Sequence, residues 1–130
     1  MHTGITAIII NERNGLHMLR ILIADDSATE IQCIQFLIRK FNFPMQMDTA
    51  DNGCTALEMI RRNRYDILLT DIKMPLLDGI HLVREARNLQ PDLAVLIFSG
   101  YGKFEYAQSA ISLGVTEYLL KPVDANALRE

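Results

Sequence analysis

Carboxylate side chains follow two of the apolar segments in this 130-residue chain. Asp25 and Asp26 come directly after residues 21–24, and Asp71 comes directly after residues 67–70. Both segments are typical of buried β-strands, and the carboxyl ends of parallel strands lie along one edge of a sheet. We therefore expect the three carboxylates to gather at one edge.

Two further apolar segments also end in polar side chains. Ser99 follows residues 95–98, and Lys121 follows residues 115–120. A single polar residue at such a place is often a helix cap or part of a loop. Four strand ends that all carry such groups favour a binding site, because open α/β sheets bind ligands at the carboxyl ends of their strands.

The residue types at these strand ends suit phosphate chemistry. Three neighbouring carboxylates need a proton or a cation to offset their repulsion, and Mg²⁺ binds carboxylates together with water and phosphate oxygens. Lys121 supplies a positive charge and Ser99 a hydroxyl donor for phosphate oxygens. Asp71 is alone at its strand end, and a carboxylate nucleophile that forms an aspartyl phosphate needs such neighbours.

The elements that must position these residues alternate between strand and helix from Leu19 onward. Strands are predicted at residues 19–24, 45–50, 67–70, 95–98 and 115–120, and helices at residues 27–41, 54–62, 82–89, around 106–111 and from about 124. This alternation predicts an α/β fold with a doubly wound, five-stranded parallel sheet of the flavodoxin-like order 2-1-3-4-5. We expect the last predicted helix to be truncated, since about two turns are left before Glu130.

Helical spacing predicts which side chains face the core. The third helix should bury Leu82, Val83, Ala86 and Leu89. Cys33 and Cys54 lie in apolar helical patterns without CxxC spacing, so we expect buried or half-buried free thiols. Ser27 with Glu30 predicts a helix start, whereas the Asp78-Gly79 pair predicts a turn.

Composition indicates one globular domain. A chain of 130 residues with 49% hydrophobic residues can bury a single core. The net charge of -3 favours neither nucleic acid nor an anionic membrane, and no apolar stretch approaches the roughly 20 residues of a membrane span. Free cysteines make the cytoplasm the expected location.

Residues 1–17 have no core pattern and should form a disordered extension before a domain at 18–130. Met18 is an alternative start.

Together these motifs resemble the receiver domain of two-component response regulators, from about Met18 to the end. The matching motifs are Asp25-Asp26, Asp71 to Pro75 with Asp78-Gly79, Ser99-Gly100 and Lys121-Pro122. The resemblance implies that Asp71 is the phosphoacceptor and that Asp25, Asp26, Asp71 and the Lys73 backbone carbonyl bind Mg²⁺. It also implies that Ser99 and Lys121 contact the phosphoryl group, and that Ser99 and Tyr118 act as switch residues.

The resemblance also implies partners. A sensor histidine kinase would donate the phosphoryl group, and phosphorylation could promote a homodimer. Residues 99–106 and 113–122 are similar to receivers fused to AraC-type helix-turn-helix domains. We therefore expect transcriptional regulation through a missing C-terminal DNA-binding domain, with no nucleic acid or membrane contact by this segment.

Two other functions are open to the same residues. A stand-alone receiver would serve as a phosphorelay intermediate, and the chain would then end natively at Glu130. A phosphoaspartyl hydrolase or transferase also uses an Asp nucleophile and Mg²⁺. Such enzymes need a substrate cap and a second catalyst close after the nucleophile, but Lys73 stands two residues after Asp71 and no insertion is long enough for a cap. We expect a signalling domain, not an enzyme.

Overall fold

The computed structural model describes residues 19–42, 44–99 and 117–120, with Ser99 and residues 117–120 described by their backbone. The elements are β1 (Leu19–Ala24), α2 (Ala28–Lys40), β2 (Met45–Ala50), α3 (Gly53–Arg62), β3 (Ile67–Thr70), α4 (Gly79–Leu89), β4 (Ala94–Ser99) and β5 (Glu117–Leu120). The helices predicted around 106–111 and after 124, and the extension at 1–17, lie outside the described residues.

The five strands form one parallel sheet in the order β2-β1-β3-β4-β5, which confirms the predicted fold. Ala24 at the end of β1 lies opposite Ala50 of β2 and Thr70 of β3. Thr70 in turn lies opposite Ile97 of β4. The strands therefore end close to one level, and the residues that follow them meet at a common edge.

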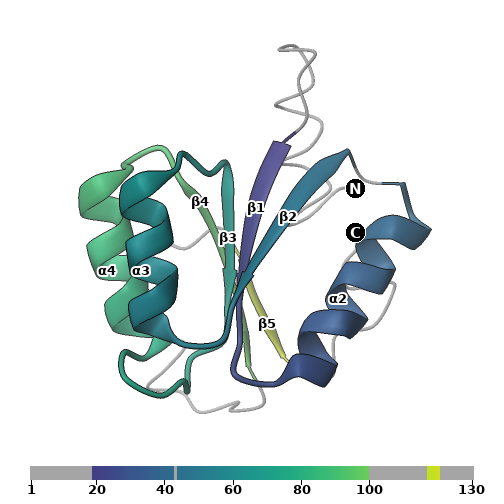
Figure 1. Ribbon diagram of the computed structural model, residues 1–130, viewed down its shortest axis with the longest axis horizontal. Coiled ribbons are helices and arrows are strands. Elements are labelled where there is room, and N and C mark those ends of the chain that lie inside the picture. The colour runs from purple at the N-terminus through teal and green to yellow at the C-terminus, as the bar shows by residue number, and fades with distance from the viewer. Residues whose placement is uncertain (1–18, 43, 100–116, 121–130) are drawn as a thin grey trace.

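Helices cover both faces of the sheet (Figure 1). In this view α3 and α4 lie side by side on one face and α2 lies on the other. Alternate β1 residues enter two cores: Leu22 packs with Leu57 of α3 and Val83 of α4, whereas Ile21 packs with Ile38 of α2. Because parallel strands are covered on both sides, they appear in the sequence as nearly continuous apolar runs.

Side-chain caps define where the helices begin. The Ser27 hydroxyl accepts a hydrogen bond from the Glu30 backbone N–H at 3.3 Å, as the sequence predicts for α2. The prediction of a turn at Asp78-Gly79 was wrong, because Asp78 is the N-cap of α4 and Gly79 is its first residue. The Asp78 carboxylate accepts from the His81 N–H at 2.9 Å, which satisfies a donor that the first helical turn leaves unpaired.

Three expectations about burial were wrong. Cys33 and Cys54 are exposed free cysteines, although both lie in helices with apolar stripes. Leu89 is 45% exposed, whereas Leu82, Val83 and Ala86 are buried as predicted. Each helix has a buried stripe, and the two thiols lie outside it; Leu89 is the last residue of α4, where it lines a groove. No helix among the described residues is long and apolar enough to cross a membrane.

Candidate functional site

The three predicted carboxylates meet at the carboxyl edge of the sheet. One oxygen from each of Asp25, Asp26 and Asp71 can be chosen so that all three lie within 4.8 Å of one another. Asp25 is 0% exposed and Asp71 is 4% exposed, while Asp26 is open to solvent. The cluster thus has two desolvated carboxylates and one accessible carboxylate.

Backbone hydrogen bonds extend the sheet into this cluster. The Asp25 N–H donates to the Ala50 carbonyl at 3.0 Å, and the Asp71 N–H donates to the Ala24 carbonyl at 2.9 Å. These bonds continue the strand pairing by one residue beyond β1 and β3. The backbones of the two buried carboxylates are therefore hydrogen-bonded to the ends of the neighbouring strands.

Local donors orient the two buried carboxylates. One Asp25 oxygen accepts from the Ser27 N–H at 2.9 Å, and one Asp71 oxygen accepts from the Ile72 N–H at 2.7 Å. The carboxylate charge strengthens such bonds. Each of these two carboxylates also has a second oxygen atom, and the accessible Asp26 contributes two further oxygen atoms to the cluster.

This donor set fits Mg²⁺. The ion prefers oxygen ligands, takes one or two carboxylates, and keeps several water molecules. Two buried carboxylates beside a solvent-facing third supply the negative charge and leave room for water on the Asp26 side. A divalent cation would also offset the repulsion between like charges at this separation.

The loop after Asp71 is closed tightly. The Gly79 N–H donates to the Ile72 carbonyl at 2.6 Å, which joins the start of the loop to the start of α4. The Leu77 N–H donates to the Pro75 carbonyl at 2.8 Å, and Leu76 between them has a φ of 73°. A hydrogen bond from residue i+2 to residue i around a positive φ is a rare, strained γ-turn. Leu76 is 78% exposed.

Among the other predicted site residues, the backbone places Ser99 at the carboxyl end of its strand. Ser99 ends β4 and lies opposite Leu120 at the end of β5, while Tyr118 lies opposite Ile97. Lys73 is exposed in the loop two residues after Asp71. Lys121 lies outside the described residues, as do the side chains of Ser99 and Tyr118. Their roles remain predictions.

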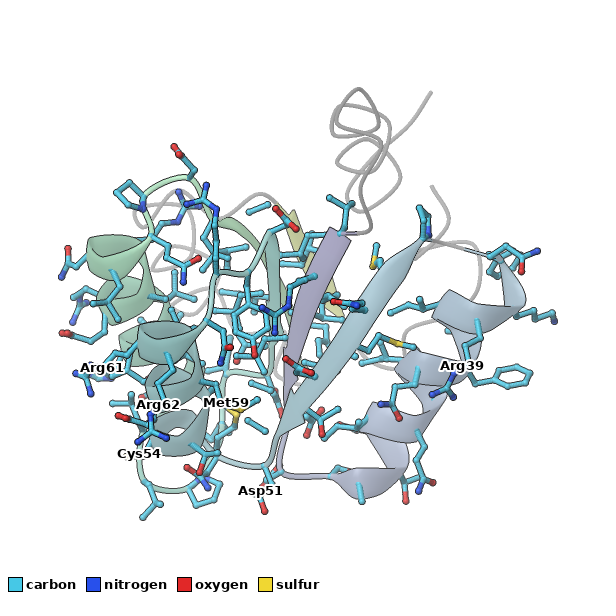
Figure 2. The ribbon with its side chains drawn as sticks, turned by 45° about the horizontal axis from the view of Figure 1, so that its top comes forward. Arg39, Asp51, Cys54, Met59, Arg61 and Arg62 are labelled. Atoms are coloured by element: carbon cyan, nitrogen blue, oxygen red, sulfur yellow. The ribbon has the colours of Figure 1, made fainter. Side chains whose placement is uncertain are left out.

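A groove that the sequence did not indicate adjoins the carboxylates. It has a volume of about 560 Å³ and runs between α2 and the end of β2; its lining includes Asp25, Asp26, Gln32, Gln35, Thr49 and Asp51. Figure 2 shows Asp51 at this edge of the sheet. The groove depends on how α2 crosses β2, which no local motif encodes.

An ionic network lies toward the opposite edge. Arg20 of β1 pairs with Asp48 of β2 at 3.2 Å, and its guanidinium lies 5.0 Å from the centre of the Tyr65 ring. The Tyr65 hydroxyl donates to the Asp48 carboxylate at 2.6 Å, and the backbone N–H of Arg20 donates to the Asp66 carboxylate at 2.9 Å. Burial, followed by the bond to Asp48, raises the pKa of Tyr65 to about 12. This network holds β1, β2 and β3 together away from the carboxylates.

Comparison with known proteins is consistent with this arrangement. The family model that matches residues 21–130 is described as the response regulator receiver domain. The chain is 34% identical over 109 residues to the transcriptional regulatory protein ZraR of Escherichia coli strain K12, covering 84% of this chain and 24% of ZraR. It is 36% identical over 106 residues to the uncharacterized transcriptional regulatory protein YesN of Bacillus subtilis strain 168, covering 81% of this chain and 29% of YesN.

Solved structures agree. The REC domain of AraT, a response regulator from Geobacillus stearothermophilus, matches with 40% identity and a TM-score of 0.76, covering 85% of this chain and 87% of that chain. A response regulator receiver domain protein from Clostridium thermocellum matches with 35% identity and a TM-score of 0.76, and the match covers 85% of this chain and 88% of that chain. The chain spans about a quarter of the length of the ZraR proteins that it matches. By its sequence, its fold and the extent of these matches, the chain belongs to the response regulator receiver domain family.

Proposed function

We propose that Asp71 accepts a phosphoryl group and that this chain relays the modification as a conformational change within a two-component system. The observation that carries the proposal is the close meeting of Asp25, Asp26 and Asp71 at the sheet edge, with Asp71 only 4% exposed. A nearly buried carboxylate beside two others lowers the stability of the fold, because burial and the repulsion between like charges both disfavour the ionised form. Its use as an acceptor beside a cation site gives the arrangement a function.

The transfer needs one nucleophilic oxygen on Asp71. That oxygen would form a bond to phosphorus while the bond from phosphorus to the donor nitrogen or acyl oxygen breaks, and the donor atom keeps the electron pair. The Ile72 N–H already orients the other part of the carboxylate through its bond to one oxygen. Mg²⁺, when bound, would neutralise charge on the transferring group. Asp25, Asp26 and the Lys73 carbonyl are the ligands that we propose beside Asp71.

The response to phosphorylation follows from charge. The modification replaces a carboxylate of charge -1 with an acyl phosphate, whose whole charge of about -1.5 to -2 lies on the phosphoryl oxygens. We propose that Ser99 and Lys121 contact these oxygens and that Tyr118 changes its position with Ser99. Ser99 and Tyr118 lie on the neighbouring strands β4 and β5, so a movement of Ser99 would occur next to the strand that carries Tyr118.

The partners are part of the same proposal. A sensor histidine kinase is the donor, and phosphorylation promotes a homodimer. The matched relatives ZraR and YesN are named transcriptional regulatory proteins and are longer than this chain. We propose a receiver at 18–130, preceded by an extension at 1–17 and linked to a DNA-binding output that regulates transcription in the cytoplasm. This segment itself would not contact nucleic acid.

Intact-mass analysis after incubation with Mg²⁺ and a small acyl phosphate tests the acceptor. The parent chain should gain one phosphoryl group, and Asp71→Asn should gain none. Asp51→Asn is the matched control, because it makes the same chemical change at an exposed aspartate that follows the neighbouring strand β2. This control should be labelled like the parent. Equal labelling of parent and Asp71→Asn would refute the assignment.

A further inference from the structure

The loop between Asp71 and α4 is held from two sides. Its two ends are joined by the hydrogen bond from the Gly79 N–H to the Ile72 carbonyl. Near its second end the loop rests on α3, where the Leu77 backbone lies against Gly53, the first residue of that helix. The loop therefore has a fixed closure and a separate support that comes from a distant part of the chain.

The contact at Gly53 leaves no room for a side chain. A Cβ atom built on Gly53 would overlap the Leu77 carbonyl oxygen and would lie 2.7 Å from both the carbonyl carbon and the Cβ of Leu77. Real Cβ atoms do not approach other heavy atoms this closely. The obstacle is mainly backbone, which cannot rotate away as the end of a long side chain can. Any larger residue must move α3 or the loop.

We propose that Gly53 is a positioning residue for the phosphorylation site: it lets α3 support the loop that follows Asp71, and so holds that loop in the geometry that binds a divalent cation. The inference rests on the proposed function. It extends that function to a residue outside all the motifs at the strand ends.

A displacement at Leu77 reaches Asp71 because the intervening segment is short and constrained. Leu77 N–H is bonded back to Pro75, so the γ-turn moves with it. Gly79 is packed against the Asp71 backbone: a Cβ on Gly79 would overlap the Asp71 carbonyl oxygen and lie 2.9 Å from its carbonyl carbon. A push on Leu77 is thus carried toward the Lys73 carbonyl and the Asp71 carboxylate.

Helix propensity and the contact with Leu77 predict opposite effects of Gly53→Ala. Alanine favours a helix more than glycine does, so Gly53→Ala would stabilise α3 if nothing lay against it. Asn52 caps this helix with its side chain, accepting from the Thr55 N–H at 2.8 Å, so the helix start does not depend on glycine. A harmful effect of Gly53→Ala therefore reports the contact with Leu77.

The test is a Mg²⁺ titration of the full 130-residue chain, followed by backbone amide chemical shifts. Gly53→Ala should bind Mg²⁺ about tenfold or more weakly than the parent, the range typical of residues that orient metal ligands. Even without Mg²⁺, the amides of Lys73 and Leu77 should shift. Cys54→Ala, an exposed change at the next position, should match the parent in both measurements.

A second control separates positioning from stability. Ile60→Val removes a buried methyl group from the far end of α3 and lowers stability without touching the loop. It should leave the Mg²⁺ affinity unchanged. The inference is overturned if Gly53→Ala binds Mg²⁺ as the parent does, if Ile60→Val weakens binding as much, or if the parent binds no Mg²⁺.

Two further provisions keep the result interpretable. If Gly53→Ala does not fold, Leu77→Gly tests the same contact from the loop side, because it removes the Cβ that lies against Gly53 and frees the loop backbone. Weaker Mg²⁺ binding is expected, and unchanged binding contradicts the inference. Phosphorylation enters neither readout. A chain that binds Mg²⁺ but takes no phosphoryl group on Asp71 would refute the proposed function alone.

Discussion

Asp71→Asn should make the Mg²⁺-free protein more stable. The substitution keeps the size of the side chain and removes one negative charge from a cluster in which Asp25 and Asp71 are both buried. Their repulsion is present only in the folded state, where the sheet holds them together. Its removal should raise the free energy of unfolding.

The distances set the size of the effect. Two unit charges 4.8 Å apart, the largest separation among the chosen oxygens, repel by about 3.5 kcal/mol at an effective dielectric constant of about 20. The variant also weakens the bond from the Ile72 N–H to the Asp71 oxygen, since a bond to a charged acceptor is stronger than a neutral one by about 1–1.5 kcal/mol. Asp26 is exposed, so solvent screens its share. The net gain should be about 2 kcal/mol.

Urea unfolding followed by far-UV circular dichroism, in a chelator, measures this gain. With a slope of about 2 kcal/mol per molar urea, the midpoint should rise by about 1 M. The control Asp51→Asn removes an exposed charge and should change stability by less than about 0.5 kcal/mol. Added Mg²⁺ should stabilise the parent more than Asp71→Asn, because the ion binds only the folded state.

Two results would refute this reasoning. A lower or unchanged midpoint for Asp71→Asn in chelator would mean that repulsion does not dominate the cluster. Equal stabilisation of both proteins by Mg²⁺ would mean that Asp71 is not part of the cation site.

Three other changes test different parts of the molecule. Tyr65→Phe should cost about 1–2 kcal/mol at neutral pH through the lost bond to Asp48. Because the pKa of Tyr65 is raised from 10.0 to about 12, the parent should lose stability between these pH values, and Tyr65→Phe should lose less in the same urea series. Gln90→Ala removes three hydrogen bonds that join the end of α4 to the end of α3 and to the segment after it, and should lower stability by about 1–3 kcal/mol in urea, whereas the exposed Gln32→Ala should be neutral. Deletion of residues 1–17 should change the free energy of unfolding, measured in urea, by less than about 0.5 kcal/mol.

The strands were predictable because their patterns are local. β2 and β3 begin and end where the sequence places them, at 45–50 and 67–70. All four residues of β3 are buried because the strand is covered on both faces, whereas β2 is an edge strand and only its first and last residues are buried. Once the strands are parallel, the meeting of their final residues follows from geometry. This is why the carboxylate cluster could be foreseen.

Features that depend on contacts between distant residues could not be predicted in this way. Cys33 precedes the buried Ile34 by one residue, or about 100° around the helix, which is enough to place it outside the buried stripe. The same surface position applies to Cys54, which Figure 2 labels on α3. Asp78-Gly79 suits either a turn or a helix start, and the choice is set by the Asp71 backbone packed against Gly79. Gly53 carries no local sign of its contact with Leu77.

The ionic network around Arg20 has a consequence for how the molecule opens. It fastens three strands near one edge of the sheet, while like charges crowd the other edge. Hydrogen exchange in Mg²⁺-free solution should therefore be graded along β1 and β3, with the Asp71 amide exchanging before the Ile67 amide. Cation binding would stabilise the carboxyl end of the sheet, where the three carboxylates repel one another. The phosphorylation that we propose would then act at the less stable end of the sheet, while the network around Arg20 holds the opposite end together.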